Sequence, residues 1–88
     1  MNAILTVIGK DQVGIIAQVS QVLAKHQVNI LDVSQTLMKD NFVMMMLVAI
    51  PAGADFTTIS SALTQLGDQL QLEINLRNAK LYDAMHTI

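Results

Sequence analysis

Two helical hydrophobic patterns, each set between strand-like runs, constrain the fold of this chain more than any other feature. From Gly14 to about His26 or Gln27, apolar side chains recur at intervals of three and four residues, as on one face of an amphipathic helix. The same spacing begins again after Asp55, a residue suited to capping a helix N-terminus, and continues to about Leu70. Four further runs indicate strands, at residues 2–8, 28–38, 42–50 and 72–77.

The resulting order of elements is βαββαβ, followed by a short tail. Two βαβ halves joined by a hairpin predict an α+β, ferredoxin-like fold, with a four-stranded antiparallel sheet and both helices on one face. Apolar residues in the tail fit one more short helix at residues 81–88. We therefore expect one domain at residues 1–79 and a C-terminal tail at residues 80–88 that packs on the sheet or on a partner.

The strand expected at residues 42–50 is apolar on both faces, whereas the last strand alternates apolar and polar residues. In this topology the first and third strands lie in the middle of the sheet, so an apolar stripe is expected on the face without helices. Monomeric proteins seldom expose large apolar patches, so the tail or a second subunit should cover it, and the tail needs no partner. Hydrophobic residues make up 52% of only 88 residues, which favours a homo-oligomer, most simply a dimer.

Residues that other activities of this fold would need are missing from the sequence. There is no cysteine, which excludes a disulfide framework and a thiolate metal site. The five lysines and arginines are scattered and the net charge is −2, so no basic patch for nucleic acid is visible. No spacing of His, Asp and Glu suggests a metal site, and no cofactor is expected. Because no motif favours a catalytic set, we expect a protein that is not an enzyme.

The sequence carries no sign of export or of membrane insertion. The first residues read as a strand and not as a signal peptide. The apolar run at residues 42–50 has nine residues, about half of what a membrane-spanning helix needs. Together with the missing cysteines, this predicts a cytoplasmic protein with no membrane partner.

The stretch GKDQVGIIAQV, residues 9–19, joins the first strand to the first helix. The first amides of a helix lack internal partners and carry the positive end of its dipole, so they suit a carboxylate or a phosphate. Asp11 would repel such a group, by about 4 kcal/mol at about 4 Å and an effective dielectric near 20. An α-amino acid removes the conflict, because its carboxylate would meet the amides around Gly14 to Ile16 and its ammonium would meet Asp11. The simpler alternative is that Asp11 or Gln12 caps the helix, and that Gly14 is small to allow close packing.

The longer motif GKDQVGIIAQVSQVLAKHQVNI resembles the signature of the ACT domain, a small regulatory module that typically binds amino acids. The resemblance rests on polar Asp11, on Gly14 at the helix start with an aliphatic pair after it, and on Asn29-Ile30 opening the second strand. It extends over residues 3–77. The chain is similar to the small, single-domain ACT proteins of bacteria, and through them to the glycine-cleavage-system regulators.

This resemblance implies a non-enzymatic regulator that binds a small amino acid at the first strand-helix loop, near a subunit interface. ACT domains usually pair, often edge to edge, with ligand between one subunit's first loop and its neighbour's second strand. Ile15 would contribute backbone groups, and Asn29 would reach from the partner or from nearby. Many members carry Asn and Pro where this chain has Asp11 and Val13, which leaves the identity of the ligand open. The expected ligand-binding residues are Asp11, Gln12, Val13, Gly14, Ile15, Asn29 and Ile30.

Two simpler explanations stand beside this hypothesis. Asn29 tolerates the left-handed conformation, so it can serve only to shape the turn after the first helix. The whole chain can also be a pure protein–protein interaction module, whose loop is structural and whose apolar stripe docks a regulatory protein partner.

Overall fold

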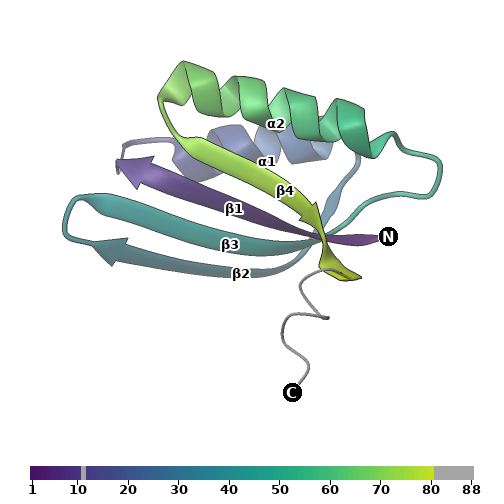
Figure 1. Cartoon of the computed structure of the whole chain (residues 1–88), viewed down its shortest axis with the longest axis horizontal. Helices are drawn as coiled ribbons and strands as arrows, with labels where there is room; N and C mark the ends of the chain where they lie inside the picture. The colour runs from purple at the N-terminus through teal and green to yellow at the C-terminus, as the bar shows by residue number, and fades with distance from the viewer. Residues whose placement is uncertain (11, 81–88) are drawn as a thin grey trace.

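The computed structural model describes residues 1–10 and 12–80. Its elements follow the order β1 (Asn2–Lys10), α1 (Ile15–Lys25), β2 (Asn29–Met38), β3 (Asn41–Ala49), α2 (Phe56–Leu70) and β4 (Glu73–Asn78), as Figure 1 shows. The strands form one antiparallel sheet in the order β2-β3-β1-β4. The predicted ferredoxin-like βαββαβ fold is confirmed, with the first and third strands in the middle. Asp11 and the tail helix expected at residues 81–88 lie outside the described residues.

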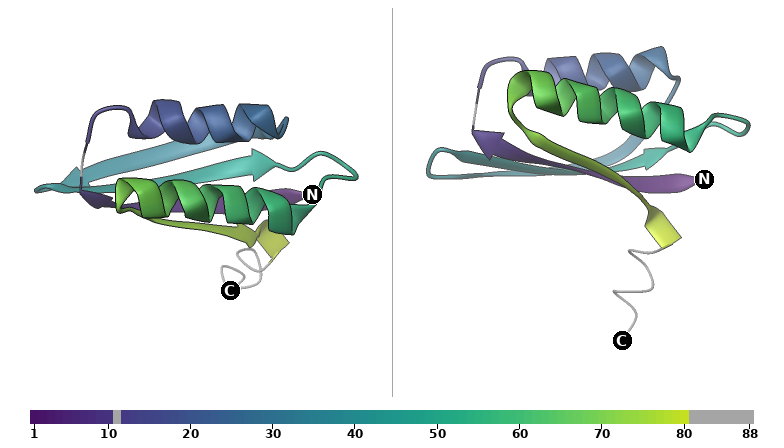
Figure 2. Two further views of the ribbon diagram at one scale, coloured as in Figure 1. Left: turned by 90° about the horizontal axis from the view of Figure 1, so that it is seen from above. Right: turned by 45° about the horizontal axis from the view of Figure 1, so that its top comes forward.

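Both helices lie on the same face of the sheet, which gives the molecule two layers (Figure 2). α2 contacts both β4 and α1. The core forms between the layers, from the inner faces of the helices and the helix-facing side chains of β1, β3 and β4. Its larger fully buried side chains are Leu5, Val7, Val19, Leu23, Met44, Met46, Val48, Ile59 and Leu63.

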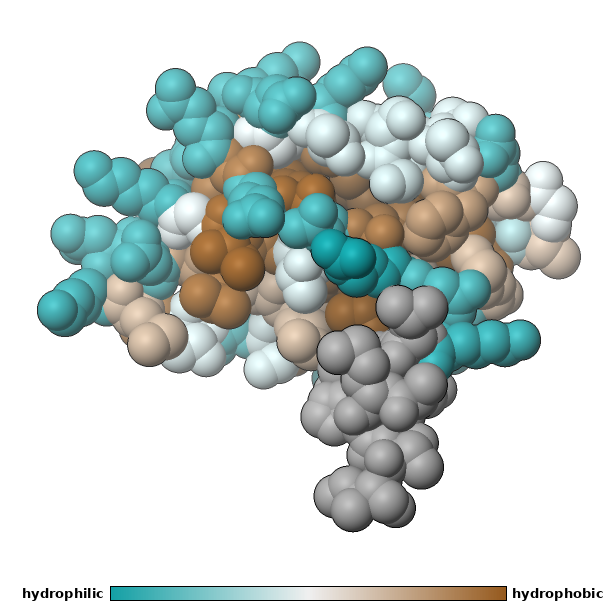
Figure 3. All heavy atoms as spheres, viewed as in Figure 1, coloured by the Kyte–Doolittle hydropathy of each residue, from teal (hydrophilic) through white to brown (hydrophobic). Residues whose placement is uncertain are grey.

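The other face of the sheet carries no layer formed by the described residues. β3 buries Met44 and Met46 against the helices, whereas Met45 lies on the open face and is 40% exposed. β4 alternates as predicted, because Ile74 and Leu76 are buried and the residues between them are not. In the view of Figure 3, apolar surface gathers in the middle of the molecule below the helices, with polar side chains around it. The predicted apolar stripe is therefore present on the open face.

The turn after α1 is built on Gln27 and not on Asn29. Gln27 adopts the left-handed conformation with φ 59°. The N–H of Val28 then donates to the carbonyl of Leu23 at 2.8 Å, a bond typical of the Schellman helix end. Asn29 is the first residue of β2 and pairs with Ala49. The interpretation of Asn29 as the residue that shapes this turn is therefore wrong.

β2 is an edge strand that the helices leave largely uncovered, since all ten of its residues are exposed. Val33 and Leu37 lie on the helix side of the sheet, yet they are 44% and 58% exposed. The register shifts between Ile30 and Asp32, which interrupts regular pairing near the start of the strand. An exposed apolar edge strand is a surface on which another chain can pair.

Candidate functional site

The loop between β1 and α1 enters the helix through a left-handed glycine. Gly14 has φ 90° and ψ 4° and stands at the N-cap position. That region costs a residue with a side chain about 1 to 2 kcal/mol, so the backbone conformation favours glycine. Among the residues that the structure describes, a Cβ at this position would meet only the Nε2 atom of Gln18, at 3.7 Å. The expectation that Gly14 allows close packing is therefore wrong, because the space beside it is open.

Gln12, which precedes this glycine by two residues, does not cap α1. Its Nε2 atom donates to the backbone carbonyl of Leu70 at 2.9 Å, at the C-terminal end of α2. The last carbonyls of a helix lack internal partners, so this bond satisfies one of them and fixes the loop against α2. The expectation of a Gln12 cap is wrong. Asp11, the other residue of that alternative, lies outside the described residues.

The N-terminal end of α1 has no side-chain cap from the residues that the structure describes. Gly14 offers no side chain at the N-cap, and no acidic residue stands in the first turn. Among residues 1–10 and 12–80, no side chain thus takes up the first amides of α1, at the positive end of the helix dipole. This arrangement is chemically suited to a carboxylate.

Two predicted site residues on either side of Gly14 have opposite environments. Val13 is fully exposed, so its side chain contributes no packing. Ile15 is only 3% exposed and belongs to the core. A ligand at this loop can therefore use only the backbone of Ile15, as the family resemblance implies.

A hollow of about 390 Å³ lies beside the start of α1, between Ile16 and the second half of β2. Gln35 and Thr36 line it, together with Leu37 and Phe42. Sequence reasoning did not identify Gln35 and Thr36. The hairpin turn at residues 39–40 was the sequence signal that could have found them. Its register places the second half of β2 next to Phe42 on β3, and Phe42 pairs with Gly9 at the end of β1, close to the loop.

Asn29 and Ile30 lie far from the loop within one chain. β3 runs from Asn41, which pairs with Lys10, to Ala49, which pairs with Asn29. At about 3.3 Å per residue, the strand puts about 26 Å between these ends. The structure thus brings residues 12–15 together and leaves Asn29 and Ile30 at the opposite end of the sheet. A small ligand at the loop can meet them only on another copy of the chain.

Charged side chains gather near the same loop, at the tip of the β2-β3 hairpin. Lys10, Lys39 and Asp40 line a small hollow of about 260 Å³ with Leu37. Within residues 1–10 and 12–80, no three His, Cys, Asp or Glu side chains gather where they could hold a metal ion. Neither helix in that part of the chain has the length and apolar character to cross a membrane.

Comparisons with known proteins agree with the observed fold. Residues 2–77 match the family model of the ACT domain. The chain is 45% identical to a UPF0237 protein of Listeria innocua, over 100% of both chains. It also matches the solved structure of an ACT domain protein from Streptococcus pneumoniae, with a TM-score of 0.83 and 36% identity over 100% of this chain and 97% of that one.

A more distant match is the regulatory subunit of aspartate kinase from Thermus flavus. Its TM-score is 0.64 at 27% identity, over 86% of this chain and 50% of that chain. The family model covers nearly all of the described residues, and the resemblance carried by residues 9–30 is confirmed. The chain belongs to the ACT domain family.

Proposed function

We propose that this chain is a regulatory protein without enzymatic activity, which binds a small amino acid at the loop before α1, near a contact between two copies. One observation carries the proposal: the first amides of α1 have no side-chain cap from the described residues. Gly14 leaves open space beside them, and a hollow lined by Gln35 and Thr36 adjoins the helix start. Membership in the ACT family and similarity to a kinase regulatory subunit support a regulatory role. The proposed location is the cytoplasm, on the ground that the sequence has no cysteine.

The ligand class follows from the charges that the loop supplies. A carboxylate would accept hydrogen bonds from the amides of Ile15 and Ile16, where the helix dipole is positive. The sequence places Asp11 in the same loop, where its carboxylate would attract an ammonium and repel a lone anion. An α-amino acid carries both charges and is therefore preferred to a phosphate or a simple carboxylic acid.

Regulation would arise if the ligand touched two copies at once. Asn29 and Ile30 are too far from the loop to reach the ligand in their own chain, so a second copy would have to supply them. A ligand held between two copies favours the arrangement in which both sets of contacts form. Its binding energy then shifts the equilibrium between two arrangements, which is the physical basis of an allosteric switch.

Calorimetric titration of the full chain with the common amino acids tests this proposal. At least one should bind, and N-acetylation or removal of its carboxylate should abolish binding because each modification removes one of the two charges. Asp11→Ala should weaken binding by roughly tenfold or more, since hydrogen bonds between charged groups contribute about 1.5 to 3 kcal/mol. The matched control is Asp55→Ala, which removes the aspartate at the other helix start and should leave affinity unchanged. No binding at millimolar concentration, or equal affinity in Asp11→Ala, would reject the site.

A second candidate function is a pure protein–protein interaction module. The observation in its favour is the edge strand β2, which exposes Leu31, Val33 and Leu37 along its length. A protein that copurifies with the chain and is released by Val33→Lys, combined with silent amino-acid titrations, would support this alternative over the first.

A further inference from the structure

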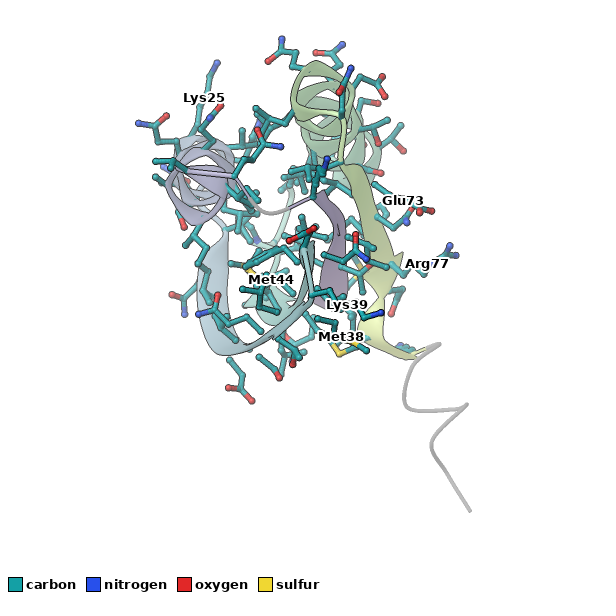
Figure 4. All side chains as sticks on the ribbon, turned by 90° about the vertical axis from the view of Figure 1, so that its left-hand side faces the viewer. Lys25, Met38, Lys39, Met44, Glu73 and Arg77 are labelled. Atoms are coloured by element: carbon teal, nitrogen blue, oxygen red, sulfur yellow. The ribbon has the colours of Figure 1, made fainter. Side chains whose placement is uncertain are left out.

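The open face of the sheet has an ordered pattern of apolar and charged side chains. Across the sheet, Leu47, Ile4 and Arg77 pair in one row, and Val43, Ile8 and Glu73 pair in a second row. Between these two rows, Met45 pairs with Thr6. Each end row thus has apolar side chains on β3 and β1 and one charge on β4. Figure 4 shows Glu73 and Arg77 projecting outward from β4, with Met44 inside the molecule.

The two end rows differ in shape, and their β4 residues carry opposite charges. A hollow of about 700 Å³ opens beside the first row, lined by Ile4, Leu47 and Met45 among others. In the second row Ile8 protrudes and is 44% exposed, although it belongs to a central strand. Arg77 marks the hollow end and Glu73 marks the protruding end, four residues away on the same strand. The hollow, which Asp32 of β2 also lines, thus lies at the Arg77 end of the face, and the exposed Ile8 lies at the Glu73 end.

We propose that this open face binds the same face of a second copy, about a two-fold axis that runs between the two sheets at Met45, parallel to the sheets and perpendicular to the strands. Such a rotation places each strand over its own copy in the partner and reverses its direction. The partner's Ile8 then enters the hollow beside Ile4 and Leu47, and Arg77 faces the partner's Glu73. Because the interface is isologous, both contacts occur twice.

The physical properties of the face fit this occupant. Strand spacings of about 4.8 Å and rises of about 3.3 Å per residue give a flat area of about 500 Å², and the accessible area of its side chains is larger. That size approaches the roughly 800 Å² per partner of a standard stable interface. Two sheets packed face to face keep their strands within about 30° of each other, so the rows stay in register. Met45 lies against its own copy at the axis, where a flexible side chain adapts to close contact.

A two-fold axis parallel to the strands would be a poorer fit. It would place the hollow of one copy against the hollow of the other. Ile8 would then face the Val43 side chain of the second copy and would not enter the hollow. Its ion pair would join Arg77 to Asp32, which pairs with Leu47 at the other edge of the same row. The two axes therefore require different charge partners for Arg77. This difference makes the axis itself testable.

The chosen axis also has a consequence for the loop before α1. Reversal of the strands brings the start of the partner's β2 to the same end of the molecule as this loop. The interface would thus place Asn29 of each copy at the loop end of the other, although on the face of the sheet opposite α1. The face-to-face dimer does not rest on amino-acid binding, and it would stand if the ligand site were rejected.

Charge exchange on the full chain is the test, with sedimentation velocity over micromolar concentrations as the measurement. Glu73→Arg and Arg77→Glu should each raise the dimer Kd by roughly tenfold, since each replaces two attractions by two repulsions. The double variant E73R/R77E should restore dimers. Mixing the two single variants should give a heterodimer. Glu73 and Arg77 are about 13 Å apart along one strand, so rescue cannot come from a contact within one chain.

The apolar centre gives a second measurement. Met45→Lys should raise the Kd by roughly 100-fold or more, because two ammonium groups would meet at the axis. The matched control is Leu31→Lys, a change of similar exposure on the β2 edge, which should leave the dimer intact. Melting at low concentration should show that both variants remain folded.

Four results would overturn the proposal. A monomeric full chain, with its Met45 methyl group shielded from a soluble paramagnetic probe at every concentration, would show that residues 81–88 cover the face. A monomer with an accessible methyl group would show that no copy covers it. Loss of dimers in Leu31→Lys but not in Met45→Lys would place the interface at the β2 edge. Rescue by D32R/R77D and not by E73R/R77E would assign the other axis.

Discussion

The two helices of this domain begin in opposite ways, although each belongs to one βαβ half of the same fold. At the start of α2, Asp55 accepts hydrogen bonds from the backbone N–H of Thr57 at 3.0 Å and from the hydroxyl of Thr58 at 2.9 Å. At the start of α1, Gly14 holds a left-handed turn and offers no side chain. The start of α2 is thus capped by its own side chain, and the start of α1 has no side-chain cap from the residues that the structure describes.

This difference indicates that the start of α2 serves stability, whereas the start of α1 is a candidate for ligand binding. A side-chain cap contributes about 1 kcal/mol, so stability alone favours one at both helices. The loop before α1 is instead held by Gln12, which bonds the far end of α2 and not the amides of α1. Gln12 thereby holds the loop against α2 without using the amides of α1. A helix start that its own loop leaves uncapped would suit a ligand carboxylate.

Among substitutions at the two helix starts, Gly14→Ala should have the largest effect on stability and on amino-acid binding. A side chain at φ 90° costs about 1 to 2 kcal/mol, and relief of that strain would turn the amides away from the ligand. Thermal unfolding should therefore lose several degrees, and calorimetry should show no amino-acid binding. Gly53→Ala is the matched control, because Gly53 has φ 84° and nothing within 4 Å of a new Cβ. It should cost similar stability and keep the ligand; equal loss of binding in both variants would contradict the assignment.

Removal of the cap at the other helix start should have the next largest effect. Asp55→Ala should lower the free energy of unfolding by about 1 kcal/mol. For a domain of this size, that corresponds to a fall in Tm of about 4 to 8 °C. Amino-acid affinity should not change. If it fell with stability, the two helix starts would not be separate in function.

A smaller effect is expected from Gln12→Ala, which removes the bond to Leu70. Because this bond is exposed, the loss should lie near the lower end of the usual range, about 0.5 kcal/mol. Hydrogen exchange should show faster opening at the first turn of α1 and at the last turn of α2 together. Gln21→Ala changes an exposed glutamine on α1 and should accelerate neither. Faster exchange at one site only would mean that Gln12 does not link them.

The smallest effect should come from Val13→Ser, because the valine is fully exposed. The free energy of unfolding should change by less than about 0.5 kcal/mol. A ligand that uses only the backbone here should bind with unchanged affinity. A marked loss of affinity at constant stability would show that the Val13 side chain contacts the ligand, and would sharpen the description of the site.

Much of the fold could be predicted because its signals are local. The helical spacing after Gly14 and after Asp55, the alternation in β4 and the two apolar faces of β3 all lie within short segments. The Asp55 cap is an example, since its partners are two and three residues away. Local patterns also located the loop before α1 as the candidate site.

The partners of the loop could not be predicted, because they come from distant parts of the chain. Gln12 meets Leu70 across 58 positions of sequence. Gln35 and Thr36 approach the loop only through the register of the hairpin, and the same register carries Asn29 to the opposite end.

The sequence by itself determined which segments form helices and strands, where α2 is capped, and that one apolar face of the sheet stays without helices. Periodicity and capping depend on neighbours along the chain, so they can be read without the fold. Only the tertiary structure decided that Gln12 bonds to α2 and does not cap α1. It also decided that Glu73 and Arg77 mark opposite ends of one apolar face, because strand pairing sets which residues share a row.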